Sequence, residues 1–293
     1  MRKTALAAGG FALVLALSAC GGAIGGSAAP APGQDKAGKI SLFSDPLQLV
    51  AAAKAGTEKS KSSKFSMEAN AAGQSIKGSG SGRYDGDNFA MTMTMNLAGE
   101  TMEMVFVNKA LYMKLPESQR AHMDSAKPWI KVSADGTDPM SKSLGPILNK
   151  AASDNDPSKT LDKITKAGKI TNSEQVPLDG QPTSHYTIDL DFAKMLDEAT
   201  GQIPGAAGDE VKNKLQGKDL HVPAELWLNS DQLPVQMVMD MSKVMSAAGA
   251  PATGEAKTTV KYTDWGSAVD IHEPPADQVT DFGALMGSAK PTR

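Results

Sequence analysis

The chain has 293 residues, of which 40% are hydrophobic and 22% are charged, and its formal net charge at pH 7 is −3. Because nucleic-acid binding needs a basic surface, this mildly acidic balance argues against a nucleic-acid partner. A single cysteine excludes an internal disulfide, so an apolar core must hold the fold. Methionine is abundant, with 16 copies, whereas aromatic residues make up only 5% of the chain.

The N-terminal segment has the pattern of a secretory signal. Two basic residues precede an apolar run from Ala5 to Leu17, which is shorter than the roughly 20 residues that span a bilayer. The "LSAC" that ends this run resembles the bacterial lipobox. The resemblance implies that residues 1–19 are a lipoprotein signal peptide, cut after Ala19, and that Cys20 carries a diacylglycerol anchor. The alternative is an ordinary signal with an incidental cysteine, but an unpaired thiol in an exported protein needs a reason.

Composition divides the rest of the chain into a tether and one domain. Residues 20–44 are rich in Gly, Ala and Pro, which is typical of a flexible linker. Residues 45–285 contain no second linker of this kind and are predicted to form a single domain. Residues 286–293 are expected to be a loose tail.

The domain opens with a predicted helix over 45–61. Asp45 suits the capping position and Pro46 the first helical position. The side chains predicted to share one face of this helix are Leu47, Val50, Ala51 and Lys54.

Residues 64–115 then alternate with a period of two, which indicates consecutive antiparallel strands with one buried face each. The side chains on the buried face of the two clearest strands are Phe89, Met91, Met93, Met95, Leu97, Met102, Met104 and Phe106. In the Gly-rich strand before them, Gly78, Gly80 and Gly82 leave one face without side chains. Such a face indicates either a bend in the sheet or a close approach of a ligand or helix to the backbone.

Helical and extended patterns alternate in the second half. Helices are predicted within 139–168 and 191–217, and Asp179-Gly180 predicts a tight turn between two strands. Three further strands are predicted within 221–271, and the chain after Pro274-Pro275 is expected to be loosely ordered. The predicted fold is therefore α+β: one large curved antiparallel sheet of about eight to eleven strands, with helices covering its concave face.

Five segments in this order resemble the actinobacterial LppX/LprA/LprF/LprG lipoproteins. They are "ALYMKL" with "PWIKVSADG", "VPLDGQPTSHYTIDLD", "PAELWLNSDQLPVQMVMD" and "TVKYTDWGSAVDIHEPP". The resemblance implies a half-barrel like those of the LolA and LolB carriers, with a hydrophobic cavity for acyl lipids or lipidated glycans. It also implies a monomer anchored to the outer face of the cell membrane, with a membrane transporter as a possible partner. The many strand methionines depart from the family.

These methionines are the candidate binding residues. The predicted cavity lining is Phe89, Met91, Met93, Met95, Met102, Met104, Phe106, Met237, Met239 and Met241. Simple core packing is the alternative for each of them, but methionine also recurs on surfaces that adapt to varied apolar partners. An acyl chain suits such a surface because each buried methylene contributes about 0.8 kcal/mol without any directional contact.

Nothing in the sequence favours an enzyme. The four histidines, at positions 122, 185, 221 and 272, lack the clustered spacing of a metal site, and no nucleophile motif is present. Asp189 and Asp191 are expected to face solvent and cap the following helix. No cofactor or metal is expected. The function predicted is a carrier or chaperone for acylated molecules, with helices 139–168 and 191–217 as a lid. The alternative is a surface lipoprotein that senses a ligand or docks a protein.

Overall fold

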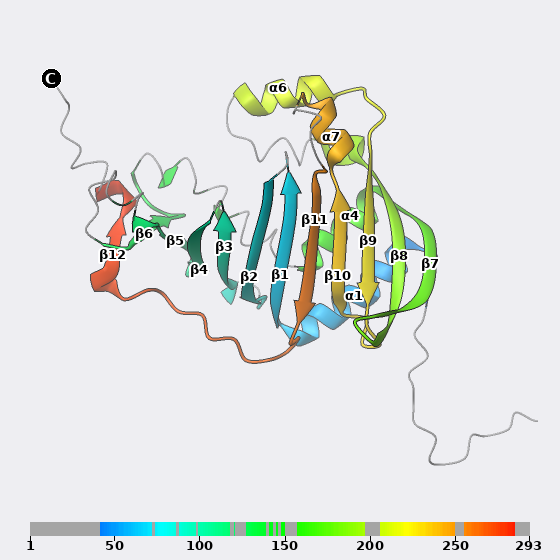
Figure 1. The fold of residues 1–293 in the computed structure, drawn as a ribbon, viewed down its shortest axis with the longest axis horizontal. Helices are drawn as coiled ribbons and strands as arrows, with labels where there is room; N and C mark the ends of the chain where they lie inside the picture. Colours follow the sequence, from blue (N-terminus) through cyan, green and yellow to red (C-terminus); the bar gives the residue numbers. More distant parts are fainter. Residues whose placement is uncertain are drawn as a thin grey trace, which may run out of the picture. The chain divides into compact units, whose positions relative to one another are not determined.

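A twelve-stranded sheet organises the protein (Figure 1). The computed structural model describes residues 42–71, 74–85, 88–97, 99–117, 120, 127–138, 141–142, 145, 148–149, 157–196, 206–249 and 255–284. All of them belong to one unit, Gly38–Arg293. The predicted signal peptide, Cys20 and nearly all of the tether lie outside the described residues, as does the tail 286–293.

The sheet runs in the order β12-β6-β5-β4-β3-β2-β1-β11-β10-β9-β8-β7. Its strands are β1 Ser62–Ala71, β2 Gln74–Arg83, β3 Ala90–Leu97, β4 Glu100–Val107, β5 Ala110–Lys114, β6 Trp129–Ser133, β7 Gly168–Leu178, β8 Gln181–Asp191, β9 His221–Leu228, β10 Pro234–Asp240, β11 Lys257–Thr263 and β12 Val279–Asp281. Neighbours are antiparallel, apart from β12 and β6, which are parallel. The predicted fold class is confirmed, although the sheet is mixed at one edge.

Tight turns in the sequence set the registers of the hairpins. Asp179 and Gly180 both have positive φ, of 50° and 79°, so the predicted turn between β7 and β8 is confirmed. The carboxamide oxygen of Asn229 accepts hydrogen bonds from the backbone N–H groups of Asp231 and Leu233, both at 3.0 Å. This side chain closes the turn between β9 and β10.

The helices are α1 Pro46–Ser60, α4 Pro157–Ala167, α6 Ala206–Leu215 and α7 Ser242–Ala247, with short 3-10 helices η2 Phe192–Met195 and η3 Ala276–Gln278. The Asp45 side chain caps α1, as predicted, by accepting from the N–H of Leu47 at 2.9 Å. The predicted buried face of α1 was wrong in part, because the buried side chains are Leu49, Val50, Ala53 and Thr57. The line Leu49–Ala53–Thr57 has the spacing of four that packs against the sheet, and Leu47 is left 62% exposed.

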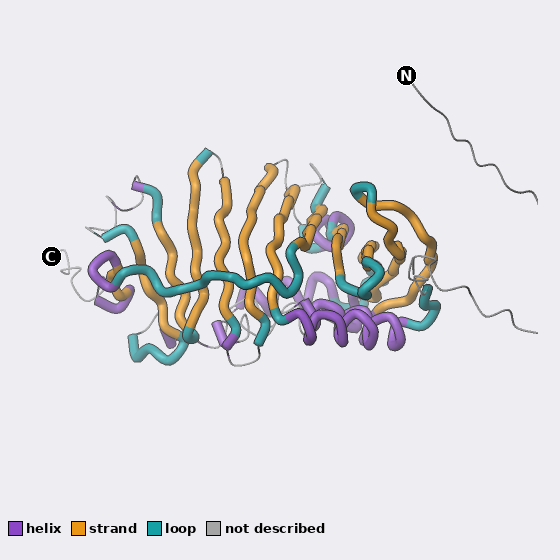
Figure 2. Tube along the Cα trace, turned by 90° about the horizontal axis from the view of Figure 1, so that it is seen from below, coloured by secondary structure: helices purple, strands orange, loops and turns teal. Residues whose placement is uncertain are grey.

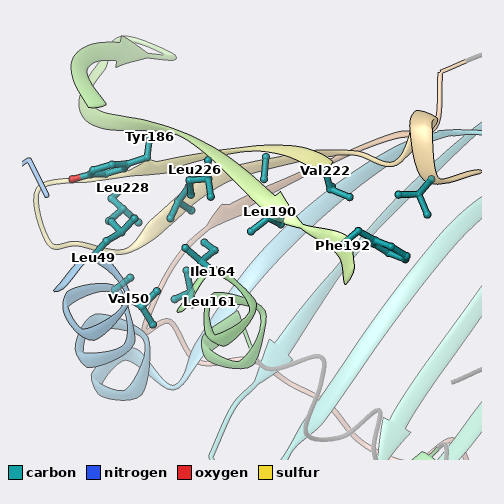
Figure 3. Packing of buried hydrophobic residues seen from close by; sticks show 14 of the residues in the cluster. Leu49, Val50, Leu161, Ile164, Tyr186, Leu190, Phe192, Val222, Leu226 and Leu228 are labelled. Carbon is teal, nitrogen blue, oxygen red and sulfur yellow. The ribbon is translucent and has the colours of Figure 1, made fainter. Parts of the chain in front are cut away.

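The main core lies where α1 and α4 pack on β8 and β9 (Figure 3). Leu49, Leu161, Tyr186, Leu190 and Val222 are each less than 2% exposed within it. The β7–β8 end of the sheet curls around these helices (Figure 2). We call the sheet face that carries α1 and α4 the helix face.

Residues 276–284 are ordered, contrary to the prediction of a loose chain after Pro274-Pro275, and they include η3 and β12. After β11 the chain crosses the other face of the sheet as a strap (Figure 2) and ends in β12, which pairs with β6. Ile271 of the strap is 2% exposed and belongs to a second core cluster with Val105, Tyr112 and Trp129. Val279 of β12 packs against the same cluster, and this long-range contact together with the pairing to β6 supplies the order that composition did not predict.

Candidate ligand-binding face

The helix face extends from the main core to the methionines of β3 and β4. A row of residues that pair across neighbouring strands connects the two regions. The row runs Tyr186, Leu226, Met237, Val260, Met67, Gly78, Met95 and Met102. A parallel row runs Phe65, Gly80, Met93, Met104, Met113 and Ile130. Because side chains alternate between faces along a strand, all of these residues share the helix face.

The two ends of the helix face are closed by packing. At one end lies the main core beneath α1 and α4. At the other end, a third cluster joins Phe89 and Phe106 to Val132 and Leu148. Its aromatic contact is close, with the rings of Phe89 and Phe106 5.6 Å apart between centroids.

Between these ends lie four methionines that we call the methionine patch: Met93, Met95, Met102 and Met104. Met93 is paired with Met104, and Met95 with Met102, across β3 and β4. All four are partly buried, and none of them belongs to the three clusters that the described residues form. The patch is therefore an apolar, partly exposed surface in the middle of the face.

The other predicted lining residues have different surroundings. Phe89 and Phe106 are 7% and 5% exposed and fill the third cluster, and Met91 packs against it. Met237 and Met239 lie in β10 and pack against the main core. The prediction that Met241 lies on a strand was wrong: β10 ends at Asp240, and Met241 is the residue before α7. The reason is a local turn, since the Asp240 side chain accepts from the N–H of Ser242 at 2.9 Å just before the helix begins.

Side chains of the protein itself lie over the glycines of β2. A Cβ atom on Gly80 would lie 2.8 Å from Cζ of Phe65, and one on Gly82 would lie 2.6 Å from the Tyr84 ring. A Cβ atom on Gly78 would lie 3.3 Å from Cγ of Met95 and 3.8 Å from Cε of Met67. The glycines thus give room to neighbouring aromatic and methionine side chains.

Most of the charge in this part of the sheet lies on the face opposite the methionine patch. At helix-face positions, β1 to β4 carry Ser, Ala, Ile, Phe, Gly, Met and Leu residues, with longer polar residues only at two strand ends, Gln74 of β2 and Glu100 of β4. The other face carries ion pairs such as Lys114–Glu103 at 2.7 Å and Lys64–Asp264 at 2.9 Å. The patch therefore offers dispersion and apolar contact rather than charge.

The two strand aspartates take different roles. Asp191 caps η2 as predicted, accepting from the N–H of Ala193 at 3.0 Å. Asp189 does not cap; its carboxylate lies 2.9 Å from Nδ1 of His221 and raises the pKa of that imidazole. Sequence reasoning missed this pair because the two residues are 32 positions apart and meet only through the register of β8 and β9.

Neither a metal cluster of the usual ligands nor a spanning helix is found in the described part of the chain. Its His, Asp and Glu side chains form no group of three that could hold a metal ion. Within the same residues, no helix has the length and apolar character needed to cross a membrane.

No family model matches the chain. An uncharacterized 31.2 kDa protein in the rplA-rplJ intergenic region of Streptomyces griseus is 22% identical over 168 residues, 56% of this chain, and the chain spans about half (52%) of that protein's length.

Among solved structures, LprF from Mycobacterium bovis is similar over 78% of this chain and 96% of its own, with 16% identity and a TM-score of 0.44. The MucA/MucB complex of Pseudomonas aeruginosa contains a chain that is similar over 79% of this chain and 60% of its own, with 11% identity and a TM-score of 0.35. LprF is one of the lipoproteins that the five sequence segments resemble. The class defined by the fold is an α+β protein with a large, open, curved sheet that bears helices on one face.

Proposed function

We propose that this protein binds acylated lipids on its helix face, at the methionine patch, and carries them within the cell envelope. The observation that supports this proposal is the partly exposed apolar surface of Met93, Met95, Met102 and Met104 between two closed ends of one sheet face. Binding is the whole activity in this proposal, and no chemical step is included.

Burial of an acyl chain would supply the affinity. A chain of 16 carbons, such as palmitate, gains on the order of 10 kcal/mol from burial of its methylenes, before the cost of its own ordering. Methionine side chains are unbranched and polarizable, so they can repack around chains of different length. The four patch residues are all uncharged, and Glu100 at the start of β4 is the one charged residue at a helix-face position of β1 to β4, which suits such a ligand.

The remainder of the proposal concerns location and partners. Cys20 would anchor the protein by diacylglycerol to the outer face of the cell membrane, and residues 21–44 would tether the domain. The ligands would be acyl lipids or lipidated glycans, and a membrane transporter would supply or receive them. These points follow from the sequence resemblance and remain proposals.

The test is lipid capture by residues 21–293, produced in a bacterial host without the leader and Cys20. The purified protein is extracted with organic solvent, and the extract and the intact protein are analysed by mass spectrometry. A stoichiometric acyl lipid is expected. It should be lost when Met93→Trp and Met104→Trp are combined, because the indoles fill the patch.

Thr94→Trp is the matched control, since Thr94 lies in β3 between Met93 and Met95 and is exposed on the other face. This variant should keep its lipid. A wild-type protein that emerges empty and takes up no added lipid would contradict the carrier proposal. A role in sensing or in docking a protein would then be the next hypothesis to test.

A further inference from the structure

The methionine patch has a second chemical property, which is the density of its thioether sulfurs. The paired residues Met93 and Met104, and Met95 and Met102, form a two-by-two square on β3 and β4. Directly opposed residues of antiparallel strands have Cβ atoms about 4.5–5.5 Å apart. Each side chain has three rotatable bonds, so three or four sulfurs can converge on one point above the square.

Further methionines border the square on both sides. Met113 of β5 is paired with Met104. Met67 of β1 and Met95 of β3 both reach the space above Gly78, which lies between them on β2. A side chain at Gly78 would separate these methionines, whereas glycine lets them approach.

We propose that the methionine patch is a binding site for a soft monovalent metal ion, Cu(I), held by thioether sulfurs alone. Soft thioether ligands favour Cu(I), whereas Ca²⁺ and Mg²⁺ require oxygen ligands, which the side chains of the patch lack. The partly buried setting shields the ion from water, and the flexible side chains can adopt the low coordination number that this ion accepts. This site does not depend on the lipid-binding proposal.

A thioether site has a distinct pH signature. Cysteine, histidine and carboxylate ligands must lose a proton to bind metal, so their affinity falls at low pH. Thioethers carry no such proton, and all four residues of the patch are methionines; Glu100, at the start of β4, is the one ionisable residue at a helix-face position of β1 to β4. Metal affinity should therefore be the same at pH 6 and at pH 8.

The experiment uses the full chain with Cys20→Ser, so that no thiol competes, in detergent micelles and chloride-free buffer. Ag(I), a redox-inert ion with the same soft ligand preference, is added to protein labelled with ¹³C at the methionine methyl groups. We expect the methyl signals of the four patch methionines to shift, and the shifts to saturate at one equivalent of Ag(I). Single Leu variants assign these signals to Met93, Met95, Met102 and Met104. Anaerobic competition against a chromogenic Cu(I) chelator then measures the affinity for Cu(I).

Leucine variants separate this proposal from lipid binding, because leucine keeps the apolar surface and removes the sulfur. The pair Met93→Leu and Met104→Leu should weaken Ag(I) binding at least tenfold, and the fourfold variant should lose it, while both retain lipid in the extraction assay. Met245→Leu is the control, since Met245 is 43% exposed on α7 and far from the patch in sequence. Circular dichroism verifies folding, and the pair Met95→Leu with Met102→Leu provides a second test if the fourfold variant unfolds.

Three results would overturn the proposal. One is the absence of saturable methyl shifts in the wild-type chain. Another is a fourfold Leu variant that binds the same equivalent of Ag(I). The last is a metal affinity that falls tenfold between pH 8 and pH 6. Such a fall would assign the metal to histidine or carboxylate ligands elsewhere.

Discussion

Asp179, in the turn between β7 and β8, accepts a hydrogen bond from Nζ of Lys261 in β11 at 2.9 Å, although β9 and β10 lie between β8 and β11 in the sheet. The tip of this hairpin therefore folds back over the face opposite the helix face, and it lies in front of β10 in Figure 1. A pocket of about 320 Å³ separates the tip from β11, with Gln181 and Asn229 in its lining. The strong twist of the sheet brings these distant strands together.

The Asp179–Lys261 pair should contribute little to stability. Its side chains are 72% and 43% exposed, so water screens the attraction. A double-mutant cycle with Asp179→Ala and Lys261→Ala should give a coupling free energy of about 0.2–1 kcal/mol by urea unfolding. A coupling above this range would mean that the hairpin tip is far better shielded from water than its exposure indicates.

Leu49 and Leu47 provide a matched pair on α1. Leu49 is 0% exposed in the main core, whereas Leu47, two positions earlier, is 62% exposed. Leu49→Ala should lower the free energy of unfolding by about 2–5 kcal/mol because it leaves a cavity. Leu47→Ala should change it by less than about 0.5 kcal/mol. Equal effects in denaturant unfolding would show that α1 buries a different face.

Gly80 and Gly78 test the packing of side chains over β2. A Cβ atom at Gly80 would collide with the Phe65 ring and with the carbonyl oxygen of Thr92, which is backbone and cannot turn away. At Gly78 the nearest atom is Cγ of Met95 at 3.3 Å, on a flexible side chain. Gly80→Ala should therefore lower the melting temperature clearly more than Gly78→Ala does. The reverse order would show that the Phe65 ring does not lie over Gly80.

His221 should make stability depend on pH. The nearby Asp189 carboxylate raises the pKa of His221 above its ordinary value near 6.5. Because the folded-state pKa is the higher one, the stabilisation is fully present below about pH 6.5 and is lost as the pH rises through the folded-state value. NMR titration should show the pKa of His221 falling in Asp189→Asn. An unchanged pKa would assign the shift to Asp219, whose carboxylate lies 3.1 Å from Nε2.

Local rules in the sequence determined much of the fold. The period of two in "AMTMTMN" placed Met91, Met93 and Met95 on one face, and the structure has them there. The Asp179-Gly180 turn and the Asp45 cap of α1 were also predictable. Each depends on backbone geometry within a few residues, which the sequence expresses directly.

Only the tertiary structure decided which of these residues are covered. Met93 and Phe106 share one face and one periodicity, yet Phe106 is closed into a core cluster and Met93 is not. Tertiary packing also decided that residues 279–281 form a strand beside β6 and that Asp189 lies against His221. It likewise left Leu47 exposed. The physical reason is common to all: periodicity assigns a side chain to a face, whereas burial depends on which distant segment packs there, and that choice is a long-range competition for apolar surface.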